Sequence, residues 1–164
     1  YWIAVSGEGV LLRMYTPHTV TVYNIVHETD QATMRDVTTA YITVIRGVML
    51  QASKAANVRQ SGLEGADAVE LYIPFSAPAV GNDGRSKRFA GVKEFSAATD
   101  KSGLWTLSVN DDTCTTIFIK GEVIEPTMTV QHLEATYDGV YKVTKVDDRD
   151  YGSADMRHWQ VGGA

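Results

Sequence analysis

The sequence predicts a mainly β fold, a small antiparallel β-barrel or sandwich with one or two short helices and long loops. About six or seven short segments either alternate apolar with polar residues or are dense in β-branched residues, as half-buried and buried strands are. Turns rich in glycine and aspartate separate these segments. Helices do not alternate with the strands, as a parallel sheet would require, and no segment repeats at a fixed period. With 164 residues, of which 44% are hydrophobic, the chain suits one compact domain.

We expect that domain to span residues 14–164, with residues 1–13 as an N-terminal extension. The apolar stretch in residues 1–13 has no basic start and is interrupted by the residues SGEG, so we do not interpret it as a targeting peptide. Met14 is either the natural start of the chain or an internal methionine, and the sequence leaves both open.

The first half of the domain contains two clear strands. Residues 19–25 (TVTVYNI) alternate, whereas residues 27–38 are polar without a period and predict a loop or a mobile excursion. Residues 39–50 (TAYITVIRGVML) predict the strongest strand, in which Gly47 marks a bulge or sharp bend. Residues 51–65 contain helix formers without an apolar face, and we expect at most a short helical turn within a loop.

The middle of the chain combines one clear strand with its least regular part. Residues 66–75 alternate, and Pro74 limits this strand to an edge or to a strand end. Residues 76–103 predict an irregular insertion. In residues 104–109 we expect a strand with Trp105, Leu107 and Val109 on one face, ended by a turn at residues 110–112.

The last third predicts one helix and a closing hairpin. Residues 115–120 predict a buried strand. Residues 126–137 carry apolar residues at helical spacing, and Asp138-Gly139 suits a helix end that needs positive φ. Residues 140–146 and 156–161 predict two strands that are joined by a long loop.

Charge and composition exclude several classes of protein. The net charge is −5, which disfavours an obligate DNA clamp, because such proteins are attracted to phosphate. No run of about 18 apolar residues is present to span a bilayer, so we expect no membrane partner. The single cysteine, Cys114, excludes an internal disulfide and a thiolate zinc cage, and indicates folding in a reducing compartment.

We find no catalytic constellation in the sequence, and we predict no catalytic residue, no cofactor and no metal ion. The four histidines (His18, His27, His132 and His158) do not occur in an HExxH pair or at a spacing that places two of them on one helical face. The acidic run at residues 147–152 has Arg149 where a calcium loop would need an acid, so a solvated turn is favoured. Cys114 has no basic neighbour in sequence and is expected to be a buried structural thiol.

One basic cluster and two tryptophans are the remaining candidates for binding. Arg85, Lys87, Arg88 and Lys93 form a predicted interface that could contact phosphate or an acidic protein, or could be a solvated loop. Trp105 and Trp159 lie in predicted strands and are expected in the core rather than on a ligand platform.

Several short segments are similar to segments of known proteins. They are 20–24 (VTVYN), 46–48 (RGV) with 54–58 (KAANV), 66–69 (ADAV) running to 73–75 (IPF), and 150–153 (DYGS) with Met156 and 158–163 (HWQVGG). Through these segments the chain resembles a family of small structural proteins encoded in tailed phages and prophages of Gram-positive bacteria. The resemblance covers most of the chain from Met14 onward and is absent from residues 1–13. The order of elements, with a Lys120-Gly121 turn before the closing hairpin, is also similar to phage head-closure (stopper or head–tail joining) proteins.

This resemblance implies a noncatalytic virion protein, made in the bacterial cytoplasm, that forms a ring in the phage neck. Its partners would be further copies of itself, the portal or adaptor, and tail proteins, and genomic DNA would pass through the channel without specific binding. A tail-terminator or tail-completion subunit is the alternative within this class. From other classes, a small-ligand or glycan-binding barrel is suggested by the eight tyrosines and three tryptophans, and an enzyme comes third.

Overall fold

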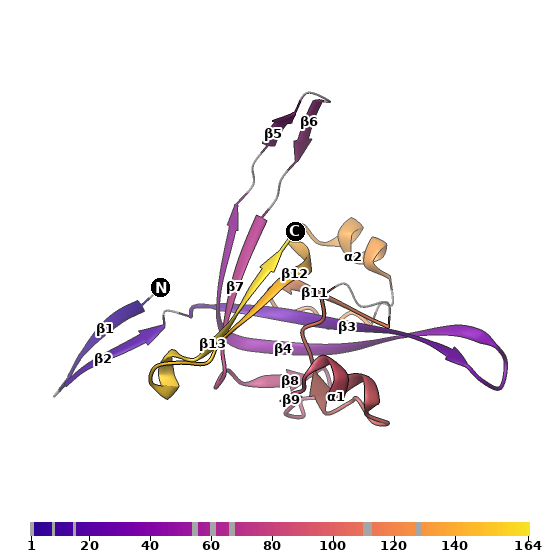
Figure 1. The fold of residues 1–164 in the computed structure, drawn as a ribbon, viewed down its shortest axis with the longest axis horizontal. Coiled ribbons are helices and arrows are strands. Elements are labelled where there is room, and N and C mark those ends of the chain that lie inside the picture. The colour runs from indigo at the N-terminus through magenta and orange to yellow at the C-terminus, as the bar shows by residue number, and fades with distance from the viewer. Residues whose placement is uncertain are drawn as a thin grey trace.

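The fold is an antiparallel β-barrel with short helices, as the sequence predicts. The computed structural model describes residues 2–7, 9–14, 16–53, 56–59, 62–65, 68–109, 113–126 and 129–164. Six strands form a ring in the order β3, β11, β12, β13, β7 and β4, and the ring closes because β4 also pairs with β3 (Figure 1). These strands are β3 (His18–Asp30), β4 (Arg35–Ser53), β7 (Ala68–Pro74), β11 (Cys114–Lys120), β12 (Val140–Arg149) and β13 (His158–Gly163). Closure removes the free sheet edges of the barrel wall.

The long strand β4 passes from one part of the wall to another at Gly47. Along one edge β4 pairs with β3, and along the other it pairs first with β8 (Ala79–Gly81) and then with β7. Between these two pairings the register with β3 shifts, and Gly47 has a φ of 76°. A bulge of this kind bends a strand and increases its twist, so the predicted bend at Gly47 is confirmed.

The barrel interior is filled from all six strands. Its core includes Val22 of β3, Leu71 of β7, Phe118 of β11 and Trp159 of β13, each less than 9% exposed. Pro74 is the last residue of β7, one of the two positions that the sequence predicts for it. The predicted alternation of β7 is confirmed, since Leu71 is buried and Glu70 is exposed.

A second core lies on the outer face of β3 and β11. Tyr23 and Ile25 of β3 and Ile117 of β11 pack there against Leu133 of α2 (Val130–Thr136). Because both faces of β3 are covered, the strand is buried continuously from residue 20 to residue 26. The helix predicted within residues 126–137 is present as α2. The predicted helix end with positive φ at Asp138-Gly139 is wrong, because neither residue has positive φ.

Three hairpins project from the barrel in different directions (Figure 1). One is the distal part of β3 and β4, residues 27–38, which we call the arm. The second is β5 (Ala56–Arg59) with β6 (Gly62–Gly65), and the third is β1 (Trp2–Gly7) with β2 (Gly9–Met14) in the predicted extension.

Two of these hairpins correct sequence predictions. Residues 27–38 are not a loop but paired strands joined by a four-residue turn, and they lack a hydrophobic period because neither face of the arm is buried. The described part of residues 51–65 is strand rather than helical turn, since β4 continues to Ser53 and β5 then pairs with β6. Pairing with neighbouring strands outweighs the weak helix propensity of this segment.

The predicted insertion at residues 76–103 is made of short elements rather than irregular chain. It contains β8, β9 (Arg88–Phe89) and α1 (Val92–Ala97), and β9 pairs in parallel with β10 (Leu104–Trp105). The predicted strand at residues 104–109 ends after Trp105, and Val109 is exposed rather than on the core face.

In the segment after β10, side chains of β3 and β11 bind the backbone groups that a neighbouring strand would otherwise bind. Asn24 Nδ2 donates a 2.8 Å hydrogen bond to the carbonyl oxygen of Thr106, and the Ser108 N–H donates to Thr116 Oγ1 at 2.9 Å. The predicted turn at residues 110–112 lies outside the described residues. The predicted closing hairpin of β12 and β13 is confirmed, and its loop contains the short 3₁₀ helix η1 (Ala154–Met156). No helix in the described segments is long and apolar enough to cross a bilayer.

Candidate functional site

The tip of the arm is a tight turn held by Asp30. One carboxylate oxygen of Asp30 accepts from the Ala32 N–H at 2.9 Å and the other from Thr33 Oγ1 at 3.0 Å, and these bonds lower the pKa of Asp30. The Met34 N–H donates to the Asp30 carbonyl at 2.7 Å. The turn is therefore ordered by its own hydrogen bonds, although no other part of the described chain supports it.

Met34 occupies an unfavourable position at this tip in two respects. Its φ of 54° lies in the left-handed region, which costs a residue with a side chain roughly 1–2 kcal/mol and favours glycine or asparagine. Its side chain is 75% exposed, compared with 61% for Ile124. Sequence analysis missed this residue, and the signal available was one methionine among polar residues.

A small pocket, which we call the slot, lies at the base of the arm. Its volume is about 140 Å³. Its lining comes from β3, from α1 and the turn that follows it, and from the start of β11 with the residue before it. The lining residues are Val26, His27, Glu28, Phe95, Ser96, Lys101, Thr113 and Cys114. Val26, Phe95 and Cys114 are buried, and they belong to one apolar cluster. The slot is thus apolar at its floor and polar at its rim.

Two opposite charges occupy the rim of the slot. The Lys101 side chain is only 8% exposed, and its Nζ donates to the carbonyl oxygen of Ala98 at 2.7 Å. The same nitrogen lies 3.6 Å from Glu28 Oε1, whose side chain is 63% exposed. The charge that the rim presents to solvent is therefore mainly the carboxylate of Glu28.

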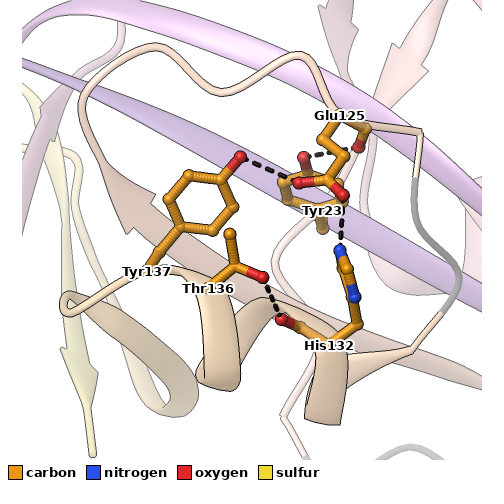
Figure 2. Close-up of polar contacts among 5 residues, drawn as sticks. All are labelled: Tyr23, Glu125, His132, Thr136 and Tyr137. Atoms are coloured by element: carbon orange, nitrogen blue, oxygen red, sulfur yellow. Dashed lines mark hydrogen bonds and ion pairs between the residues drawn. The ribbon is translucent and has the colours of Figure 1, made fainter.

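The densest group of ionisable side chains around α2 centres on Glu125, as Figure 2 shows. Glu125 Oε1 contacts His132 Nε2, and Tyr137 Oη donates to Glu125 Oε2 at 2.9 Å. Tyr23 Oη donates to the backbone carbonyl of Glu125 at 2.8 Å. We call these four residues the Glu125 cluster. It links β3, the segment after β11 and α2.

The hydrogen bonds of the Glu125 cluster hold α2 against the barrel. The hydrogen bonds of His132 and Tyr137 lower the pKa of Glu125, so this carboxylate is ionised at neutral pH. The hydrogen bond to Glu125 raises the pKa of Tyr137, and burial raises that of Tyr23. Both phenol protons are held in hydrogen bonds to Glu125, so the cluster fixes α2 over the outer face of β3.

The structure does not bring the four predicted interface residues together as one free basic patch. Arg85 and Lys93 are exposed. Lys87 Nζ donates to the Ile42 carbonyl oxygen at 2.9 Å, and burial lowers its pKa. Arg88 forms an ion pair with Glu94, whose pKa it lowers. The interface role of these residues stays a prediction.

The placement of Trp105, Trp159 and Cys114 agrees with the sequence. Trp105 and Trp159 are 3% and 8% exposed and lie with ring centroids 5.5 Å apart. Phe89, in the basic loop, contacts both indoles and anchors that loop to the core. Cys114 is buried. In the segments that the structure describes, no group of three or more His, Cys, Asp or Glu side chains could hold a metal ion.

Comparison with protein families matches residues 15–164 to the model of a family of unknown function, DUF6751. The chain belongs to family DUF6751. The DUF6751 match begins directly after β2, so it includes the barrel, the arm, the slot and the Glu125 cluster. No curated protein and no solved structure matches the chain.

Proposed function

We propose that this DUF6751 protein is a noncatalytic virion structural protein, a head-closure subunit that forms a ring in the phage neck between the portal or adaptor and the tail. The observation that carries the proposal is the ordered arm, which extends from a closed barrel without burying any of its own residues from 28 to 37. Ordering residues costs conformational entropy that no core contact in the arm offsets. An arm of this kind is typical of a segment that is buried by a neighbouring molecule.

In a ring of subunits, the barrel would serve as the rigid body and the arm and its edge would make the contacts between subunits. Each of the six strands in the ring pairs on both sides over part of its length, which limits indiscriminate addition of strands. Within the described segments, the edge of β4 before Thr43 has no strand partner on the side away from β3. Such an edge can accept a strand from a neighbouring subunit, which is a common mode of assembly. The resemblance to head-closure proteins supports the same assignment.

The alternatives differ in their partners. A tail-terminator or tail-completion subunit would form a similar ring on the tail rather than on the portal. A glycan-binding barrel would need exposed aromatic residues, whereas Trp105 and Trp159 are buried in the core, which removes the main reason for that proposal.

Light scattering and electron microscopy of the full chain test the proposal, first with the chain alone and then with a portal protein and a tail-tube protein from the same genome. We expect rings that contain the chain and that bind the portal. Rings that bind only the tail tube would replace head closure with tail termination. A chain that stays monomeric alone and with both partners would refute the proposal.

A further inference from the structure

We propose that the tip of the arm, with Met34 at its centre, inserts into the slot of a second copy of this chain. The inference rests on the proposed function, which requires contacts between copies, and it names the two surfaces that meet. The tip has an exposed apolar side chain held in a strained backbone conformation. Strain of this kind persists where the residue serves a purpose that a glycine would not.

The slot matches the Met34 side chain in size and apolar character. A volume of about 140 Å³ accommodates one unbranched side chain such as that of methionine. The floor offers Phe95 and Cys114, and a thioether sulfur makes favourable contacts with an aromatic ring. Methionine is also the apolar residue that adapts most readily to an irregular pocket.

Arg35 is the charge of the tip that complements the slot, whereas the carboxylates of Asp30 and Asp36 accept hydrogen bonds within the arm. Arg35 directly follows Met34, and within the described segments it has no ion-pair partner. The charge exposed at the rim of the slot is the carboxylate of Glu28. A guanidinium brought to this rim can bind the carboxylate with two parallel hydrogen bonds. Arg35 of one copy would therefore pair with Glu28 of the next.

The tip cannot reach the slot of its own chain. Val26, His27 and Glu28 line the slot and also form the base of the arm, and the paired strands between Glu28 and the turn are extended. Figure 1 shows the arm pointing away from α1, which forms another wall of the slot. The contact must therefore be between molecules. Where each copy gives its tip to one neighbour and receives the tip of another, the contact is head-to-tail. Head-to-tail contacts close into rings when the rotation allows it.

The first experiment separates assembly from folding by means of Met34→Gly. Glycine removes the side chain and relieves the left-handed strain, so the variant is expected to unfold at the same or a higher urea concentration than the wild type. Its self-association, measured by light scattering under conditions in which the wild type assembles, is expected to weaken about tenfold or more. The matched control is Ile124→Ser, which removes an apolar side chain that is 61% exposed in the segment between β11 and α2 and should leave assembly unchanged.

The second experiment uses the native cysteine in the slot. In Met34→Cys, mild oxidation during assembly should link the thiol introduced at the arm tip of one copy to Cys114 of the next, giving a ladder of covalent oligomers on a denaturing gel. The ladder should disappear in Met34→Cys with Cys114→Ser and should be absent from Ile124→Cys.

Each outcome decides the inference. Normal assembly of Met34→Gly would overturn it while the proposed ring function stands. So would a covalent dimer of Met34→Cys with Cys114→Ser, because that variant can be linked only through two arm tips. If Met34→Gly assembles weakly but Met34→Cys gives no ladder, the slot is not the surface that receives the tip. A wild-type chain that never assembles would overturn both proposals.

Discussion

Gly163, at the end of β13, shows how tightly single residues are constrained in this barrel. A Cβ atom at this position would lie 2.8 Å from Phe118 Cζ and 2.8 Å from Val69 Cγ1, and both of these side chains are buried. We expect Gly163→Ala to destabilise the fold by about 1–3 kcal/mol, because the core cannot move aside. Urea unfolding measures this change. Gly103→Ala, where a Cβ meets nothing within 4 Å, should lie within about 0.5 kcal/mol of the wild type.

The Glu125 cluster makes a prediction about pH. The hydrogen bond from His132, and then that from Tyr137, lower the pKa of Glu125 in the folded state below its unfolded value. A lowered carboxyl pKa stabilises the fold above the unfolded pKa, and this stabilisation is lost as the pH falls through the folded pKa. Glu125→Gln should therefore lower the urea midpoint at about pH 7 and have little effect at about pH 2.5.

The control for this prediction is Glu134→Gln, which changes an exposed carboxylate on the same helix α2. It should shift the urea midpoint little at either pH. An equal loss of stability for Glu125→Gln at both pH values would show that its ionised carboxylate does not hold α2 in place.

The sequence predicted burial and backbone geometry correctly where these depend on the local pattern of residues. Val69 and Leu71 alternate with polar residues, and Gly47 interrupts a β-branched run, so their burial and the bulge could be predicted locally. Glu125 and His132 could not, because their contact depends on where α2 lies over β3, which no spacing in the sequence encodes.

At the scale of elements, the arm should be dispensable for folding and required for assembly. The His27 N–H donates to Thr113, away from β4, so Glu28 and Val37 form the next hydrogen-bonded pair across the arm. Replacing residues 29–36 by Asn-Gly, which favours a two-residue hairpin turn, therefore keeps the register. Because residues 29–36 are all exposed, the free energy of unfolding should change by no more than about 1 kcal/mol.

Light scattering of the same arm-shortened variant should show monomers under conditions in which the wild type assembles. A loss of several kcal/mol in unfolding would mean that the arm supports the barrel, which contradicts its exposure. The arm was missed from the sequence for the same reason that it is dispensable for folding: strands exposed on both faces have no hydrophobic alternation to detect.

At the scale of the whole molecule, the closed ring predicts a single cooperative unfolding transition. The ring closes through pairs that are distant in sequence, such as β3 with β11 and β4 with β7, so removing one strand opens the wall that buries Trp105 and Trp159. Tryptophan fluorescence and far-ultraviolet circular dichroism should therefore give the same urea midpoint. The sequence predicted the strands of this ring and left a closed barrel and a sandwich as alternatives, because strand order depends on contacts between distant segments.

The net charge of the whole molecule makes the last prediction, which concerns DNA. The chain carries a net charge of −5, Lys87 is turned inward to a backbone carbonyl, and Arg88 is paired with Glu94. Attraction to phosphate, which dominates nonspecific DNA binding, is therefore weak, and DNA could pass through a ring of this chain without being retained. In a gel-shift assay at physiological ionic strength, the assembled chain should not retard linear duplex DNA. If the wild type retards DNA and the double variant Arg85→Glu with Lys93→Glu does not, the exposed part of the basic loop binds phosphate. The channel would then bind DNA rather than let it pass.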